Sequence, residues 1–240
     1  MILLGMDTST PATAVALRLA GGETLEARDD PPQGARPGHT SQLLPLAVGL
    51  LDRADIDWGA LDGIAVGLGP GTFTGLRIGI ASARALAQSL GIGLIGVSGL
   101  RALALPALRE MPRVLAVLDA RRGEAFLAAY GARSAEQADE LLAPKALRPE
   151  QLGEAVAESM QGGSVKGPLS AVGDGALLFA EQLRAAGAEV VAADSPLHRL
   201  TAAAICELAL CSEAAETVEQ VLPSYGRRPD AELALEASGR

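Results

Sequence analysis

Short apolar runs separated by polar turns begin the chain and predict three strands that pair with their neighbours in sequence. The runs are Ile2–Met6, Thr13–Leu19 and Thr24–Arg28. No basic segment precedes the first run and Asp7 interrupts it early, which predicts a buried strand rather than a signal peptide or a membrane span. The pattern is typical of a β-meander.

Helical and strand-like apolar patterns then alternate along the chain. The segments are a helix at Ser41–Arg53, a strand at Gly63–Val66, a helix at Thr74–Leu90 and a strand at Ile92–Val97. A meander followed by alternating helices and strands predicts an α/β layer with a mixed sheet.

The same order of elements begins again after Pro112. The later segments are strands at Val114–Leu118, Glu124–Tyr130, Ala171–Val172 and Val190–Val191, and helices at Ala176–Ala186 and Leu200–Cys211. This repetition predicts a duplicated α/β unit whose halves, residues 1–107 and 108–240, divide between Leu105 and Pro112. The second half is expected to include the C-terminal helix and a charged, extended tail from Pro223.

The two predicted helices of the first half are apolar on more than one face. A surface helix is apolar on one side only, but Leu43, Leu44, Leu46 and Val48 cannot all face one sheet. Apolar residues also cover most of Thr74–Leu90. Two interpretations stay open: both helices are buried between the sheet and neighbouring segments, or their outer faces pack on a second subunit.

The composition narrows the range of partners. Apolar residues make up 49% of the 240 residues, enough for a sizeable core, and the net charge is -9. Because affinity for phosphate requires clustered positive charge, this balance argues against nucleic-acid binding by the chain alone. Cys206 and Cys211 do not share a helix face, so no disulfide is expected and a reducing cytoplasm is the simple interpretation.

The segment Gly67–Gly79 (GLGPGTFTGLRIG) runs from a predicted strand into a helix, where backbone N–H groups can hold a phosphate. It has no lysine for a P-loop, and Thr72 stands where the dinucleotide motif requires its third glycine. The favoured interpretation is a tight structural turn, in which Pro70 fixes the backbone and Thr72 or Thr74 caps the helix.

The sequence contains no pattern typical of catalysis or of metal binding. His39 and His198 are far apart and form no HxxxH or HExxH pair, so neither a metallopeptidase nor a histidine-bound iron site is expected. Neither cysteine has a histidine near it in sequence that would act as its base. We therefore predict no catalytic residue and no metal site.

Three polar turns at strand ends are candidate nucleotide loops, because actin-like and sugar-kinase-like folds place two phosphate loops and an adenosine loop at such turns. The candidate residues are Asp7, Thr8, Ser9, Asp119, Arg121, Gly123, Gly173 and Gly175. Arg121 and Arg122 stand where those folds favour glycine. Weak binding of ATP or ADP is compatible with these turns, but no cofactor is required and strong ATPase activity is not expected.

The most specific segments of the chain are Gly67–Gly79 and Leu118–Phe126 (LDARRGEAF). Other distinctive segments are Gly5–Leu17, His39–Pro45, Ile95–Ser98 and Pro223–Asp230. In all of these the chain resembles the TsaB (YeaZ) family, a branch of the actin/sugar-kinase/Hsp70 (ASKHA) superfamily. It departs from the family in the tail, where Gly226 and Arg227 stand in place of a frequent Leu-Arg.

The resemblance implies a duplicated actin-like (ribonuclease H-like) fold with mixed five-stranded sheets flanked by helices. It also implies the role of a non-catalytic dimerisation subunit in the synthesis of N6-threonylcarbamoyladenosine in tRNA. The partners would be a TsaD-like subunit, which transfers threonylcarbamoyl, and a TsaE-like ATPase. Alone, the chain would form a homodimer, and it would meet tRNA only through the complex, without a membrane.

In this family the two helices that are unusually apolar here form the subunit interface. The residues that the resemblance assigns to it are Leu43, Leu46, Leu50, Gly75, Leu76, Ile78, Gly79, Ser82 and Leu86. Gly75 and Gly79 are expected to let the helices of two subunits approach closely.

Three rival functions stay open. The chain would be an active ATP-dependent kinase or transferase if Asp7 and the turns at Asp119 and Gly173 were functional. It would be a peptidase by resemblance to TsaD, which the missing histidine pair argues against. It would be a plain α/β scaffold if it had no role in tRNA modification.

Overall fold

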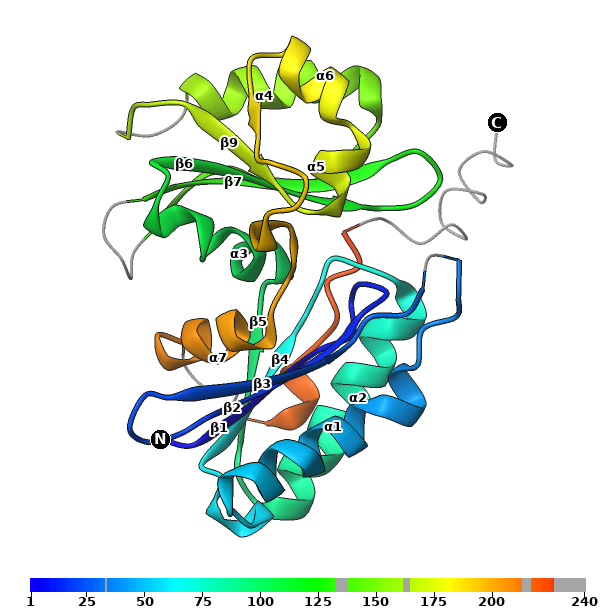
Figure 1. Ribbon diagram of the computed structural model, residues 1–240, viewed down its shortest axis with the longest axis vertical. Coiled ribbons are helices and arrows are strands. Elements are labelled where there is room, and N and C mark those ends of the chain that lie inside the picture. The colour runs from blue at the N-terminus through cyan, green and yellow to red at the C-terminus, as the bar shows by residue number, and fades with distance from the viewer. Residues whose placement is uncertain (33, 133–137, 162–164, 213–216, 227–240) are drawn as a thin grey trace.

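The computed structural model describes residues 1–32, 34–132, 138–161, 165–212 and 217–226. The strands within these ranges form two five-stranded sheets (Figure 1). The first sheet contains β1 (Leu3–Asp7), β2 (Thr13–Arg18), β3 (Thr24–Asp29), β4 (Gly63–Gly67) and β5 (Gly93–Val97). The second contains β6 (Arg113–Asp119), β7 (Ala125–Ala132), β8 (Ala138–Leu147), β9 (Leu169–Val172) and β10 (Glu189–Val190).

The two sheets have the same topology. Their strand orders are β3-β2-β1-β4-β5 and β8-β7-β6-β9-β10. In each sheet the first three strands pair antiparallel, and the fourth and fifth join in parallel. The predicted duplicated α/β unit with mixed five-stranded sheets, an actin-like fold, is therefore confirmed.

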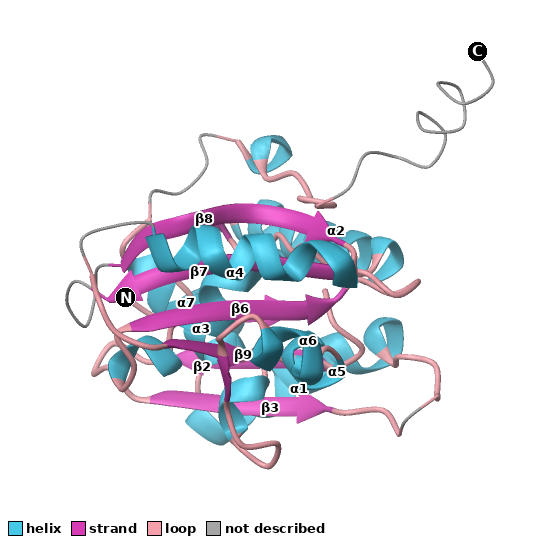
Figure 2. Cartoon of the chain, turned by 90° about the horizontal axis from the view of Figure 1, so that it is seen from above, coloured by secondary structure: helices cyan, strands magenta, loops and turns pink. Residues whose placement is uncertain are grey.

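Helices cover the outer face of each sheet, and a third layer of helices lies between the two sheets. The outer face of the first sheet packs against α1 (His39–Ala54) and α2 (Phe73–Leu90), and that of the second against α4 (Leu152–Gln161), α5 (Asp174–Leu178) and α6 (Ala180–Ala185). Between the sheets lie α3 (Gly99–Ala104) and α7 (Ala202–Leu210), which share one apolar core with both (Figure 1). Figure 2 looks onto the second sheet, with α4, α5 and α6 in front of its strands.

Helix α7 packs on the first sheet although it follows the second in sequence. It contacts β1 and β2 most extensively. The side chain of Glu26 on β3 accepts hydrogen bonds from the first backbone N–H groups of α7, at Ala202 (2.8 Å) and Ala203 (3.2 Å). The predicted second half, residues 108–240, therefore includes a helix that belongs structurally to the first sheet.

Three elements differ from the sequence prediction. The predicted helix at Ala176–Ala186 is two helices, α5 and α6. The break lies at Phe179, whose backbone angles (φ -107°, ψ 27°) are not helical. Helices α3 and α4 and strand β8 were not predicted at all. In β8, Pro144 cannot donate a ladder hydrogen bond, but it lies at the sheet edge beside a register shift near Ala129, where proline is tolerated.

Candidate functional site

The outer face of α1 and α2 retains exposed apolar residues. On α1, Leu44 and Val48 are 47% and 42% exposed, and on α2 Phe73 is 53% exposed. The face of α2 that points away from the sheet continues from Phe73 through Arg77, Ala81, Ala85 and Gln88, all exposed. We call the exposed residues Leu44, Val48, Phe73, Arg77, Ala81 and Ala85 the outer helix face.

The structure divides the predicted interface residues into two groups. Leu43, Leu50, Gly75, Leu76 and Gly79 are buried within the chain and offer a partner little or no surface. Those at the margin of the outer helix face are Leu46, Ile78, Ser82 and Leu86, which are half-buried. Four exposed residues of these helices, Leu44, Val48, Ala81 and Ala85, were not among the predicted interface residues. They lie four apart on their helices, which is the signal in the sequence that could have indicated their exposure.

The prediction that Gly75 and Gly79 allow a partner helix to approach is wrong. Both glycines face Thr8, at the turn after β1. A Cβ at Gly75 would lie 2.0 Å from the carbonyl oxygen of Thr8, and one at Gly79 would lie 2.4 Å from its hydroxyl oxygen. The Thr8 hydroxyl also donates a hydrogen bond of 2.7 Å to the Gly75 carbonyl. The glycines therefore seat α2 on its own sheet.

The Gly-rich segment Gly67–Gly79 uses its backbone groups within the chain. Leu68 N–H donates to Val97 and Thr72 N–H donates to Ser9, both at 2.8 Å. The carbonyl of Gly69 accepts from Gly99 N–H at 2.8 Å. These contacts favour the interpretation of a structural turn over that of a phosphate cradle. Thr72 is the N-cap residue of α2, but its side chain does not form the predicted capping hydrogen bond.

The first candidate nucleotide turn is closed to solvent. Asp7, Thr8 and Ser9 are each 2% exposed. Asp7 Oδ1 accepts hydrogen bonds from the backbone N–H and the hydroxyl of Ser9, at 2.9 and 2.8 Å. Within the part of the chain that is described, Asp7 Oδ2 has no hydrogen-bond partner. Burial raises the pKa of Asp7 to about 6, against the opposing effects of the Ser9 hydrogen bonds and of Arg28.

The second and third candidate turns are joined to each other. Asp119 N–H donates to the Asp174 carboxylate at 3.0 Å, while the Asp119 carboxylate accepts from Arg121 N–H at 2.7 Å and pairs with its guanidinium at 3.1 Å. Arg121, Arg122 and Gly123 all have positive φ, at 62°, 56° and 76°. The arginines therefore occupy backbone conformations that glycine favours, as the sequence comparison with nucleotide-binding folds implied.

The glycines of the third turn serve packing. A Cβ at Gly173 would lie 2.0 Å from the carbonyl oxygen of Val117, and one at Gly175 would lie 2.7 Å from the carbonyl carbon of Leu118. Both contacts bring the start of α5 against β6. Gly123 has open space around it, so its role is conformational.

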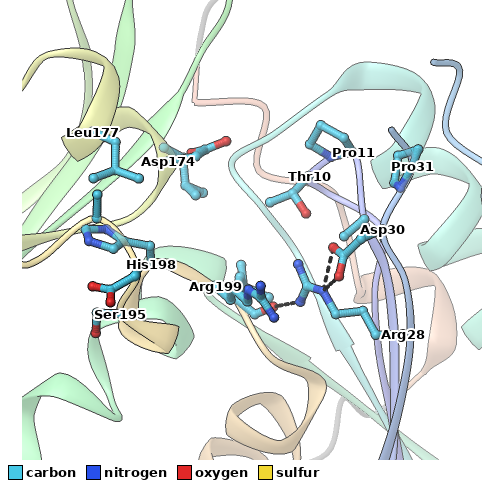
Figure 3. Close-up of a pocket in the computed structure, with 15 residues that line it drawn as sticks. Thr10, Pro11, Arg28, Asp30, Pro31, Asp174, Leu177, Ser195, His198 and Arg199 are labelled. Carbon is cyan, nitrogen blue, oxygen red and sulfur yellow. Dashed lines mark hydrogen bonds and ion pairs between the residues drawn. The ribbon is translucent and has the colours of Figure 1, made fainter. Parts of the chain in front are cut away.

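A cavity of about 410 Å³ opens between the two halves beside these turns (Figure 3). One wall comes from the first half, with Thr10 from the first candidate turn and Arg28 and Asp30 from the end of β3. The other comes from the second half and the segment before α7, and its lining residues are Leu118, Asp174, Leu177, Ala193, Asp194, Ser195, His198, Arg199 and Leu200. Thr10 and Asp174 lie beside residues of the predicted nucleotide turns but were not themselves candidate residues. The segment from Ala193 to Leu200 was not predicted to form a site.

The charges of the cavity are mixed and partly paired. Arg28 Nε donates to both carboxylate oxygens of Asp30, at 2.7 and 2.9 Å, and Arg28 Nη1 donates to the Leu200 carbonyl at 2.6 Å. In Figure 3, Arg199 extends toward Arg28 from the opposite wall. With Asp174 and Asp194 also present, the lining suits a small polar molecule rather than a strongly anionic one.

Both histidines have structural partners. His39 Nδ1 lies 2.9 Å from the Thr13 hydroxyl, and burial lowers the pKa of this histidine. His198 bridges the Gly173 backbone (3.1 Å) and the Ala192 carbonyl (3.0 Å). Across the described residues, no group of three or more His, Cys, Asp or Glu side chains is placed to hold a metal ion. No helix in the described ranges has the length and apolar character to span a membrane.

Comparison with solved structures identifies relatives along nearly the whole chain. A Pseudomonas aeruginosa protein described as uncharacterized with similarity to peptidase YEAZ shares 32% identity, with 94% of this chain and 99% of that chain covered and a TM-score of 0.77. YeaZ from Pseudomonas aeruginosa shares 31% identity, with 93% and 99% covered and a TM-score of 0.76. This chain belongs to the TsaB (YeaZ) family. The family model of TsaD, tRNA N6-adenosine threonylcarbamoyltransferase, also matches residues 31–235.

Curated relatives of this TsaB family member match over shorter segments. The tRNA threonylcarbamoyladenosine biosynthesis protein TsaB of Escherichia coli is 38% identical over 132 residues, which are 54% of this chain and 55% of that protein. TsaB of Bacillus subtilis is 32% identical over 130 residues, which are 54% and 55% of the two chains. The matched segment thus spans about half the length of these relatives.

Proposed function

We propose that this chain is a docking subunit in the synthesis of N6-threonylcarbamoyladenosine in tRNA. It pairs with a TsaD-like subunit, acts together with a TsaE-like ATPase, forms a homodimer when alone, and meets tRNA only through the complex. The observation that carries the docking role is the outer helix face, which leaves apolar residues of α1 and α2 exposed. The names of the TsaB relatives support the tRNA pathway.

The shape of the outer helix face suits another helix pair. The small side chains of Ala81 and Ala85 lie between Phe73 and Gln88 on the exposed side of α2 and allow a neighbouring helix to approach closely. Leu44 and Val48 on α1 add apolar surface beside them. Because this chain matches the family model of TsaD, a TsaD-like subunit has a related fold with comparable helices, so the same face would serve both partners.

We expect Ala81→Arg to weaken both self-association and pairing with the TsaD-like subunit by about 100-fold, since an unpaired charge would be buried at the contact. Sedimentation equilibrium and co-purification measure the two interactions. Ala157→Arg is the matched control, because Ala157 is exposed on α4 in the second half. Equal binding by the wild type and Ala81→Arg would reject this face as the docking surface.

The pathway is tested separately from the surface. Depletion of the chain should remove N6-threonylcarbamoyladenosine from tRNA digests, and the wild-type chain should restore it while Ala81→Arg should not. If depletion left the modified nucleoside unchanged, the chain would be a scaffold without this role, even if it bound a TsaD-like subunit.

We also propose that the chain has no catalytic activity of its own and binds nucleotide weakly at most. Two observations support this. The turn at Asp7 is closed to solvent, and the backbone of β6 occupies the space beside Gly173 and Gly175. We expect no saturable heat of ADP binding up to ~1 mM, which corresponds to about -4 kcal/mol of binding free energy. ATP turnover by the purified chain would instead favour the rival function of a kinase or transferase.

A further inference from the structure

We propose that residues 217–226, a segment near the C-terminus, are a clasp that fastens the two halves of the molecule together. The clasp acts at the turn between β4 and α2 (residues 68–72), which we call the Gly-rich turn. We call residues 217–226 the strap. It follows α7 in sequence, runs along α2, and ends between the two halves. Residues 227–230, which complete the tail segment shared with the TsaB family, lie outside the described residues. The proposal does not depend on the proposed function.

Two arginines of α2 hold the strap. Arg84 Nη2 donates to the backbone carbonyls of Glu219 and Val221, at 2.9 and 2.5 Å. Val221 is buried in the core between α1, α2 and the first sheet. One end of the strap is therefore fixed to the first half by both hydrogen bonds and apolar contact.

The second arginine acts through an aromatic pair. The Tyr225 and Phe73 rings stack with centroids 5.1 Å apart, and the guanidinium carbon of Arg77 lies 3.7 Å from the Phe73 centroid. Arg77 Nε also donates to the Tyr225 hydroxyl at 3.2 Å. A stacked aromatic pair with a cation over one ring is a favourable contact even at a partly exposed site.

The last residues of the strap reach the second half. Ser224 N–H donates to the Leu68 carbonyl at 2.8 Å, in the Gly-rich turn. Gly226 then lies between Pro70 of that turn and Phe126 of β7, because a Cβ at Gly226 would be 2.8 Å from both side chains. Its φ of 65° also disfavours any other residue. The end of the strap therefore lies between the Gly-rich turn of the first half and β7 of the second.

The attachment is local, which makes it releasable. The described strap makes few backbone hydrogen bonds, and Leu222, Ser224 and Gly226 are exposed. Segments with few buried contacts open at a lower free energy than the sheets on which they lie. Because Phe73 and Arg77 also belong to the outer helix face, the clasp connects that face to the junction of the two halves.

Amide hydrogen exchange of the full chain, read by mass spectrometry, tests the clasp. In Tyr225→Ala and in Gly226→Val we expect exchange to accelerate about tenfold, equivalent to about 1.4 kcal/mol, in peptides of the Gly-rich turn and of the start of β7. Peptides of β2 should not change. The matched control is Leu222→Ala, which alters an exposed strap residue outside these contacts.

The location of the change decides the outcome. Acceleration in both the Gly-rich turn and the start of β7, in either variant, supports the clasp. Acceleration in only one of the two regions, acceleration confined to the strap, or no acceleration would overturn it, because the strap would then not join the two halves. Circular dichroism of each variant confirms that the sheets remain folded.

Discussion

Gly75→Ala is expected to lower the free energy of unfolding by about 3 kcal/mol, the upper part of the range for overpacked interiors. The added methyl carbon would lie 2.0 Å from the carbonyl oxygen of Thr8, which is backbone and cannot turn aside. Either α2 or the turn after β1 must then move, and the 2.7 Å hydrogen bond from the Thr8 hydroxyl to Gly75 is lost with it. Urea unfolding followed by circular dichroism measures the change.

Gly49→Ala provides the opposite case on the neighbouring helix. Gly49 lies within α1, and a Cβ there would meet nothing within 4 Å. Alanine should therefore stabilise the chain by about 0.5–1 kcal/mol, because glycine loses more backbone entropy when it folds. If Gly75→Ala unfolded at the same urea concentration as the wild type, the contact between α2 and Thr8 would not be as close as the structure has it.

The glycines of α2, Gly75 and Gly79, show what periodicity can and cannot predict. The spacing of Gly75, Gly79 and Ala83 correctly indicates a stripe of small residues on α2, and a close backbone approach. It does not say what approaches. Only the tertiary fold reveals that the turn after β1 occupies this stripe, whereas Ala81 and Ala85 face solvent.

The fold itself was largely predictable where local patterns agree with tertiary burial. The meander, α1 and α2 have strong apolar periodicity and clear turn residues, and their bounds are close to those predicted. Strand β8 has the sequence ADELLAPKAL, rich in helix formers and interrupted by Pro144, so its pairing with β7 overrides local preference. Helix α3 spans only Gly99–Ala104, too short for a periodic signal.

The cavity was less predictable than the fold, because its walls come from separate parts of the chain. Arg28 ends a strand of the first half, and Arg199 precedes the helix that returns to that half. No spacing along the sequence relates them. The polar turns that the sequence did single out lie nearby, but their own residues are mostly engaged in holding β1, β6 and α5 together.

Asp7 stands out among these turn residues because burial makes its charge costly. Its carboxylate lies against Gly67, where a Cβ would be only 1.9 Å from Oδ2. Among the described residues Oδ2 accepts no hydrogen bond, so the charge is only partly compensated. A pKa of about 6 in the folded chain, against the ordinary aspartate value of 3.8, corresponds to an ionisation cost of about 3 kcal/mol at neutral pH.

The sign of the pH dependence follows from this shift. Well below pH 3.8, the ordinary pKa of the group, Asp7 is protonated in both folded and unfolded chains, and its contribution to stability is fully present. As the pH rises through the folded pKa of about 6, the unfolded chain releases its proton more readily and this contribution is lost. Considered by itself, the ionisation of Asp7 therefore makes the chain less stable at pH 8 than at pH 4.

Asp7→Asn should remove this dependence and raise the free energy of unfolding at pH 8 by about 2 kcal/mol. The gain is smaller than the ionisation cost because the amide N–H₂ would itself be buried without a clear partner. Urea unfolding at pH values from 4 to 8 should show the advantage of Asp7→Asn over the wild type shrinking as the pH falls below 6. Asp57→Asn, at an exposed carboxylate, is the control and should change stability by less than about 0.5 kcal/mol at every pH.

A loss of stability in Asp7→Asn at pH 8 would contradict the prediction. It would mean that the folded chain accommodates the ionised carboxylate better than the buried amide. Stabilisation by the amide would mean that the buried acid lowers the stability of the folded chain. The pH series therefore separates an aspartate that holds the turn from one that weakens it.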